Sequence, residues 1–190
     1  MKIIGISGVS RAGKDTLYQG LLDAYPEYTF TRLSIADFIR VELADFILNH
    51  TGISVWNSTP EEKEMYRPLM VWYGNIKRQQ TQGKYFLDRL QEQLHTRSVY
   101  VNSDYCVITD IRFKEFMFDE PDWVKSKGGT MIHLRRLDDT CTSIPPNNEL
   151  ESKNDPILYQ LSDISITWPT IPTQKGIVEY IRTLELLPLK

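Results

Sequence analysis

The sequence predicts an α/β protein of three layers, in which helices cover both faces of a central, mostly parallel sheet. Short apolar runs alternate along the chain with longer segments whose apolar residues recur at helical spacing. The run at 105–109 (YCVIT) is apolar on both alternating faces, which is typical of strands inside parallel sheets. With 190 residues, 41% of them hydrophobic, the chain suits one core, so residues 1–190 are predicted to form a single domain.

The first part of the chain contains two predicted strand–helix units. Residues 2–7 (KIIGIS) form a short apolar run that precedes a glycine-rich loop and a helical segment at 17–25. Residues 28–34 alternate like a second strand, and residues 35–48 are predicted to form the next helix. The apolar stripe of that helix consists of Ile35, Phe38, Ile39, Leu43, Phe46 and Ile47.

The middle of the chain, about residues 56–97, is predicted to be a wholly helical block. Helices at 61–80 and 85–94 are separated by a break near Gly83. Pro60 fits the first turn of the earlier helix, and Pro68 is expected to kink it. Because a single domain leaves no room for a separate binding domain, a second binding site is expected in this insertion.

The last part of the chain completes the sheet. The strand at 104–111 is followed by a helical stretch that contains Pro121, and further strands are predicted at 130–134 and 163–167, before a final helix at 174–187. The segment at about 135–156 is polar, with PPNN at its centre. We therefore expect this segment to be a mobile lid rather than part of the core.

The composition excludes several classes of protein. With 22 basic and 25 acidic residues the net charge is -3, so there is no broad cationic face for nucleic acid. Cys106 and Cys141 lack the spacing of a zinc site or a disulfide framework. The sequence shows neither a signal peptide nor an apolar stretch of roughly 20 residues that could cross a bilayer. We expect a soluble, cytoplasmic protein with no nucleic-acid or membrane partner.

The strongest motif lies at residues 8–16 (GVSRAGKDT), between the first strand and the first helix. Two glycines flank four residues and are followed by lysine, which is the pattern of a phosphate-binding P-loop. Such a loop directs backbone N–H groups and the positive end of a helix dipole at triphosphate oxygens. Lys14 is expected to bridge the β- and γ-phosphates. The predicted ATP-binding residues of this loop are Gly8, Arg11, Ala12, Gly13, Lys14, Asp15 and Thr16.

Asp15 stands where switch-type P-loop proteins keep a metal-binding hydroxyl, with Thr16 one position later. A carboxylate there favours a small-molecule kinase over a GTPase or a motor. Asp15 would orient Mg²⁺-bound water or accept a substrate proton, and Thr16 would contact a phosphate or a Mg²⁺-bound water. The alternative role for Asp15 is an acid stabilised by the dipole at a helix start.

Asp110 and Arg112 end the third strand, at the sheet edge where ligands of open α/β sheets bind. Asp110 is predicted to hold Mg²⁺ through water, together with Asp15 and Thr16, and Arg112 to clamp a phosphate during transfer. A structural Asp–Arg ion pair is the alternative. The predicted catalytic residues are Lys14, Asp15, Asp110 and Arg112.

The helical block supplies arginines and aromatic residues that suit a phosphate and a base. Arg67 and Arg78 are eleven residues apart and can share one helix face. Trp72 and Tyr85 are candidate stacking platforms, although aromatic residues at helical spacing are more often part of the core. The predicted acceptor site comprises Asp37, Arg40, Arg67, Trp72, Arg78, Tyr85 and Arg112.

Arg135 and Arg136, where the lid begins, are predicted to close over the ATP phosphates and exclude water. Glu149 and Glu151 are candidate anchors for this lid. The spacing of the three histidines assigns them no function.

Four segments of the sequence resemble the bacteriophage deoxynucleoside monophosphate kinases. The segments occur in that family's order and span most of the chain. They are residues 5–16 (GISGVSRAGKDT), Arg67 through Gly74 to Arg78 with 83–86 (GKYF), 109–113 (TDIRF), and 128–132 (GGTMI).

The resemblance implies a P-loop kinase fold, transfer of the ATP γ-phosphoryl group to a deoxynucleoside 5′-monophosphate, Mg²⁺ as cofactor, a homodimer, and a host cytoplasm as location. Residues 114–116 (KEF) depart from the family, as do Val71 and Asn75, which leaves the base open. The alternatives are a dephospho-CoA kinase or phosphomevalonate kinase, and a P-loop nucleotide-binding protein without transferase activity.

Overall fold

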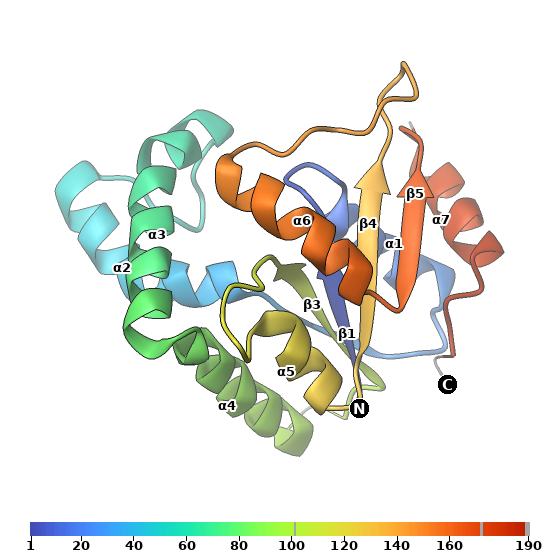
Figure 1. Cartoon of the computed structure of the whole chain (residues 1–190), viewed down its shortest axis with the longest axis horizontal. Helices are drawn as coiled ribbons and strands as arrows, with labels where there is room; N and C mark the ends of the chain where they lie inside the picture. Colours follow the sequence, from blue (N-terminus) through green and yellow to red (C-terminus); the bar gives the residue numbers. More distant parts are fainter. Residues whose placement is uncertain (101, 172, 189–190) are drawn as a thin grey trace.

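The computed structural model describes residues 1–100, 102–171 and 173–188 and confirms the predicted fold class. Its sheet has five strands in the order β2-β3-β1-β4-β5, and every neighbouring pair is parallel (Figure 1). The central strand β1 therefore lies between β3 and β4. The strands are β1 (Lys2–Ser7), β2 (Phe30–Leu33), β3 (Tyr105–Ile111), β4 (Thr130–Arg136) and β5 (Ile164–Trp168).

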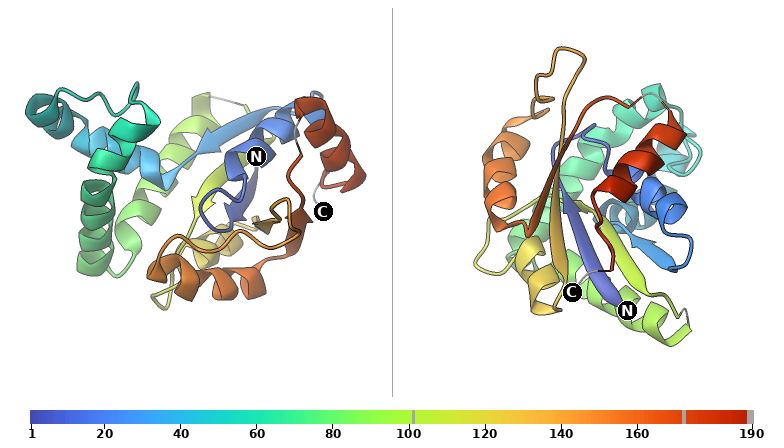
Figure 2. Two further views of the ribbon diagram at one scale, coloured as in Figure 1. Left: turned by 90° about the horizontal axis from the view of Figure 1, so that it is seen from above. Right: turned by 90° about the vertical axis from the view of Figure 1, so that its right-hand side faces the viewer.

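Helices cover both faces of this sheet. On one face α1 (Lys14–Ala24) packs beside α7 (Gln174–Thr183), and on the other α4 (Lys84–Tyr100), α5 (Glu120–Ser126) and α6 (Glu149–Leu161) contribute to a second core (Figures 1 and 2). Tyr105 and Val107 belong to the first core, and Cys106 and Ile108 to the second. Strand β3 is buried along its whole length because its side chains alternate between two covered faces.

The helices α2 (Ile35–Thr51) and α3 (Pro60–Thr81) stand at one side of the sheet and share a smaller apolar cluster. Helix α3 begins with a capping box, in which the Thr59 hydroxyl accepts from the Glu62 N–H and the Glu62 carboxylate accepts from the Thr59 N–H. Pro60 occupies the predicted first turn, and Pro68 lies inside the helix. The predicted stripe of α2 includes Phe46, but its side chain is 52% exposed and lies outside the core.

The second half of the segment predicted as a lid, residues 135–156, is helical, because α6 begins at Glu149. The Asn148 side chain caps this helix by accepting from the Glu151 N–H (2.9 Å). Asn154 and Leu158 are the buried residues of α6. Pro156 also lies inside the helix. The polar composition was misleading because this helix is held largely by polar contacts. Strand β4 also continues through Arg136, while α7 ends at Thr183 instead of 187.

Among the described residues, none of the helices is both long and apolar enough to cross a lipid bilayer.

Candidate functional site

The loop between β1 and α1 has the backbone that its glycines predict. Gly8 and Gly13 have φ values of 131° and 93°, and Arg11 has a φ of 65°. A Cβ atom at Gly8 would lie 2.2 Å from the Leu134 carbonyl oxygen, and one at Gly13 would lie 2.8 Å from the Trp168 ring. A side chain at Gly8 would require a backbone shift, and one at Gly13 would require the Trp168 ring to move. Both positions also have a positive φ, which favours glycine.

Lys14 lies beneath this loop, buried, and not in solvent as a loop residue would suggest. Its Nζ donates to the carbonyl oxygens of Gly8 and Val9, at 2.8 Å each. Burial, followed by the charge of Arg112, lowers the pKa of Lys14 to about 8. The amine is therefore positioned by the loop and close enough to Arg112 for their charges to interact.

Asp15 and Thr16 are exposed at the start of α1. The Asp15 carboxylate accepts from Arg32 at 3.2 Å, and Arg32 also binds Asp37 at 2.9 Å. Asp37 in turn pairs with Arg40. A partly exposed ion-pair chain thus joins the phosphate-binding loop to the first turn of α2, through Arg32, which the sequence gave no reason to single out.

Asp110 has a role that the sequence did not predict. Its carboxylate accepts from the Ser34 hydroxyl (2.8 Å) and from the N–H groups of Ile35 (2.9 Å) and Ala36 (2.8 Å). It thereby caps α2 from a neighbouring strand, and it makes no ion pair with Arg112 among the contacts of the described residues. Both carboxylate oxygens are already used, which argues against Asp110 as a direct metal ligand.

Within residues 1–100, 102–171 and 173–188, no three His, Cys, Asp or Glu side chains are grouped in a way that would hold a metal ion. The predicted set of Asp15, Thr16 and Asp110 therefore does not form a protein cage. Mg²⁺ commonly takes only one or two protein ligands and completes its shell with phosphate oxygens and water. The exposed Thr16 hydroxyl and Asp15 carboxylate fit that mode of binding.

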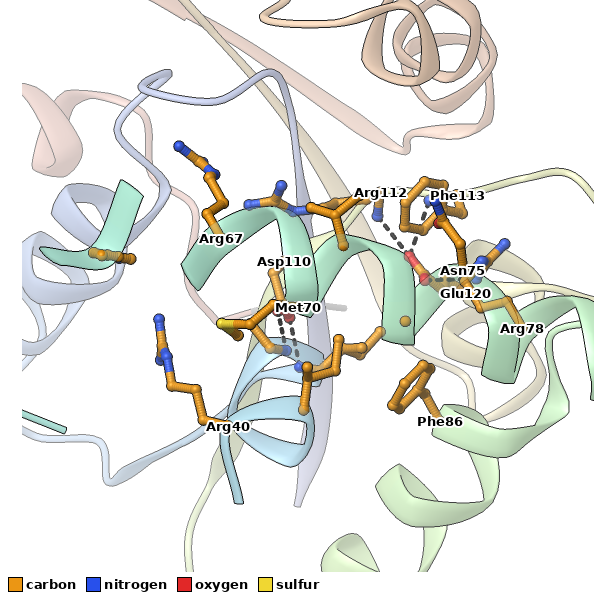
Figure 3. Close-up of a pocket in the computed structure, with 16 residues that line it drawn as sticks. Arg40, Arg67, Met70, Asn75, Arg78, Phe86, Asp110, Arg112, Phe113 and Glu120 are labelled. Carbon is orange, nitrogen blue, oxygen red and sulfur yellow. Dashed lines mark hydrogen bonds and ion pairs between the residues drawn. The ribbon is translucent and has the colours of Figure 1, made fainter. Parts of the chain in front are cut away.

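A pocket of about 180 Å³ lies between α2, α3 and the end of β3 (Figure 3). Arg40 and Arg67 lie toward one end of it, while Phe86, Phe113 and Asn75 lie toward the other. The pocket brings together four of the predicted acceptor residues and the predicted catalytic Asp110. These lining residues are Arg40, Arg67, Arg78, Arg112 and Asp110.

Arg78, which was predicted to bind the acceptor, is engaged with carboxylates of the protein itself. It is 3% exposed, and its guanidinium donates to Asp119 at 2.8 and 3.1 Å and to Glu120 at 3.0 Å. Its Cζ also lies 4.1 Å from the centre of the Phe113 ring. Held by two buried carboxylates, the Arg78 guanidinium forms part of the pocket wall.

Trp72 and Tyr85 do not line this pocket. Trp72 is 59% exposed, and the Tyr85 hydroxyl donates to Glu42 at 2.8 Å. Trp72 lies on a face of α3, and Tyr85 on a face of α4, that does not line the pocket. The aromatic surface comes from Phe113, directly after β3, and from Phe86 on α4. Phe113 is the last residue of the 109–113 segment (TDIRF), so the sequence placed it beside Arg112 although it was not singled out as a base platform.

A second cavity, of about 200 Å³, adjoins the other side of the phosphate-binding loop. Gly13, Thr16, Arg136 and Trp168 are among the residues that line it. Trp168 Nε1 donates to the Ala12 carbonyl at 3.1 Å, so the end of β5 supports the loop directly. The sequence gave no signal for Trp168, because its contact depends on strand order.

Arg135 and Arg136 separate to opposite faces of β4 and do not act as a pair. Arg136 lines the second cavity, and its guanidinium donates to the Thr170 hydroxyl at 3.3 Å. Arg135 lies over the Tyr159 ring of α6, with its Cζ 5.1 Å from the ring centre. Alternation along a strand predicts this divergence.

Glu151, in the first turn of α6, contacts both the loop and Arg112. One carboxylate oxygen accepts from the N–H groups of Ser10 (3.3 Å) and Asn147 (2.9 Å), and the other lies 3.7 Å from the Arg112 guanidinium. Of the two predicted lid anchors, Glu149 and Glu151, it is Glu151 that contacts the phosphate-binding loop.

His133, to which its spacing in the sequence assigned no function, is buried in the middle of β4. Burial, with the charges of Arg135 and Lys14, lowers its pKa to about 4, so the imidazole is neutral at pH 7. Its Nε2 lies 3.1 Å from Asp155 of α6 but outside hydrogen-bond geometry. It therefore adds no positive charge beneath the phosphate-binding loop.

No protein-family model and no curated protein matches the chain by sequence. Among solved structures, the fold is similar to a dephospho-CoA kinase from Campylobacter jejuni at 13% identity and a TM-score of 0.46, covering 97% of this chain and 98% of that one. A shikimate kinase from Bacteroides thetaiotaomicron gives 13% identity and 0.47, covering 98% and 97%. A shikimate kinase from Acinetobacter baumannii in complex with shikimate gives 13% and 0.44, covering 98% and 93%. Because these values are low, the function proposed below depends on this chain's own residues.

Proposed function

We propose that this chain is an ATP-dependent phosphotransferase whose acceptor is a nucleoside 5′-monophosphate, most simply a deoxynucleotide. The observation that carries the proposal is the meeting of two phosphate sites at one sheet edge. Lys14 lies in the loop that follows β1, and Arg112 follows the adjacent strand β3 at the mouth of the arginine-lined pocket. The depressed pKa of Lys14, caused in part by Arg112, supports their closeness.

These positions suggest a separate role for each group in the transfer reaction. The loop N–H groups and Lys14 bind the β- and γ-phosphates, and Arg112 stabilises charge on the phosphoryl group during transfer. An oxygen of the acceptor phosphate forms the new bond to the γ-phosphorus as the bond to the β-phosphate oxygen breaks, and ADP leaves. Because a phosphate oxygen is already ionised, no general base is required. Asp15 therefore has no proton to accept. Thr16 and Asp15 would hold Mg²⁺ together with the nucleotide phosphates, and the ion would supply charge neutralisation there.

The acceptor pocket fits a molecule with a charged end and a flat, apolar end. Arg40 and Arg67 are partly exposed and pair with the single carboxylates of Asp37 and Glu64, so both are available to an incoming phosphate. Phe113 offers a ring face at the other end, and the Asn75 amide beside it can read a base edge. The second cavity, with Trp168 and Arg136, is the proposed place of the ATP adenine.

A substrate panel tests this proposal. The common ribonucleoside and deoxynucleoside monophosphates are incubated with ATP and Mg²⁺, and formation of ADP and of the diphosphate is measured together. We expect stoichiometric formation of both with at least one monophosphate. ADP without any diphosphate would indicate hydrolysis alone, and no turnover with any member would reject nucleotide acceptors in favour of the alternatives.

A further inference from the structure

The Glu151 carboxylate contacts two groups that, in the proposed reaction, would bind phosphates: the Ser10 N–H and the Arg112 guanidinium. Its side chain is only 12% exposed, and it reaches the Ser10 N–H in the phosphate-binding loop and the Arg112 guanidinium at the acceptor pocket. Carboxylate and phosphate oxygens accept from the same donors. A triphosphate bound in the loop therefore competes with Glu151 for the Ser10 N–H and is repelled by its charge.

The helix that carries Glu151 is attached mainly through polar groups. The Lys114 N–H donates to the Asn154 side chain at 2.8 Å, and Asp155 lies beside His133. Leu158 provides buried apolar contact, about two turns farther along α6 than Glu151. The first turn of α6 can therefore shift without exposing much apolar surface.

We propose that Glu151 is an internal competitor for phosphate, and that its displacement couples the donor site to the acceptor site. ATP releases Glu151 from Ser10, which in turn releases Arg112 for the acceptor phosphate. Because such coupling is reciprocal, acceptor binding at Arg112 strengthens ATP binding by the same factor. This inference rests on the proposed function for its acceptor half, whereas its donor half depends only on binding of a triphosphate in the loop.

The test compares Glu151→Gln with a matched control, Glu149→Gln. Both residues lie in the first turn of α6, so both substitutions remove one charge near the same helix terminus, but Glu149 is exposed. Titration calorimetry is carried out with the non-hydrolysable ATP analogue AMP-PNP and Mg²⁺, and with dAMP, dGMP, dCMP and dTMP, each alone and in the presence of the other ligand. Circular dichroism checks that each variant is folded.

In the wild type, we expect AMP-PNP to raise the affinity for the accepted monophosphate by at least about fivefold, the lower end of ordinary coupling. Glu151→Gln should bind AMP-PNP more tightly by a similar factor and show no coupling, while Glu149→Gln behaves as the wild type. Unchanged or weaker AMP-PNP binding by Glu151→Gln overturns the inference, as does wild-type coupling that survives the substitution. If no monophosphate binds, the proposed function fails, and the AMP-PNP comparison still decides whether Glu151 competes with phosphate.

Discussion

At the scale of single residues, Lys14 is buried, yet it must carry a positive charge to bind phosphate in the proposed function. Burial and Arg112 lower the pKa of Lys14 to about 8, whereas phosphate oxygens favour the protonated amine. Binding of a triphosphate therefore takes up a proton above pH 8. We expect Lys14 protonation to leave the affinity for AMP-PNP with Mg²⁺ unchanged below pH 8. Above pH 8, loss of the proton should lower that affinity by up to about tenfold per pH unit.

Calorimetric titrations at pH 7, 8 and 9 check this expectation, with Lys14→Met as the control. The variant should bind weakly at every pH, lose this pH dependence, and transfer phosphate at least about a hundredfold more slowly. A wild-type affinity that is the same at pH 7 and pH 9 would show that the amine stays charged and that the proposed environment of Lys14 is wrong.

Two arginines of α3 provide a second residue-scale contrast, because they face the same pocket with different partners. Arg78→Ala leaves Asp119 and Glu120 buried without their cation and should lower the free energy of unfolding by about 3–5 kcal/mol. Arg67→Ala loses only an exposed pair with Glu64, so it should change stability by about 0.5 kcal/mol or less and raise the acceptor KM.

Urea unfolding and steady-state kinetics separate these effects. The control is Arg182→Ala on α7, which loses one long hydrogen bond to the Ala24 carbonyl (3.4 Å), lies outside both cavities and should have a small effect. If Arg78→Ala is too unstable to purify, Arg78→Lys keeps the charge but loses the two-pronged contact, so it should be measurably destabilised. A fully stable Arg78 variant with impaired acceptor binding would restore the phosphate role that the sequence predicted.

The residue roles that could be predicted are those defined within one short segment. The loop at 8–16 carries its glycines, lysine and helix start together, so its geometry follows from the sequence. Arg78 could not be assigned in this way, because its partners lie 41 and 42 residues away and arrive only when α5 packs beside α3. The cap that Asp110 provides for α2 could not be predicted either, because its partners Ile35 and Ala36 are also distant in the sequence.

At the scale of elements, the apolar periodicities predicted the strands and the paired helices α2 and α3, but not α6. Helix α6 was assigned to a polar lid because it attaches through Glu151, Asn154 and Asp155 and buries few apolar side chains. Hydropathy patterns detect a helix through its apolar face. A helix attached mainly by hydrogen bonds shows no such pattern.

This attachment predicts how α6 responds to nucleotide. In the free protein its first turn is held to the loop by Glu151, so binding of AMP-PNP should change amide hydrogen exchange at 144–154. The amides of α4 at 88–96, which line neither the acceptor pocket nor the second cavity, should be unaffected. Exchange measured by mass spectrometry with and without AMP-PNP tests both halves. Identical exchange at 144–154 in the two states would reject any ligand-driven movement of α6.

At the scale of the whole molecule, three neighbouring strands deliver the site to one edge of the sheet. Strand β1 ends at the phosphate-binding loop, β3 at Asp110 and Arg112, and β4 at Arg135 and Arg136. The alternation of strands and helices predicted that these ends share an edge. It did not predict that β1 lies between β3 and β4, which brings the two phosphate sites side by side.

The same strands also join the two cores, which should make unfolding cooperative. Leu134 of β4 is fully buried on the α1 and α7 face, and Leu90 of α4 is fully buried on the other. Replacing either by Ala should cost about 2–5 kcal/mol. Because β1, β3 and β4 contribute side chains to both cores, each loss should destabilise the whole sheet.

Trp168 and Trp123 report on these cores separately, since Trp168 lies in the first and Trp123 in the second. In two variants that each retain one of these tryptophans, with Phe at the remaining tryptophan positions, urea unfolding followed by fluorescence should give coincident midpoints. Adding Leu90→Ala should lower both midpoints equally, and so should adding Leu134→Ala. If Leu90→Ala shifts the Trp123 transition and leaves the Trp168 transition in place, the two faces unfold independently and the sheet does not transmit stability between them.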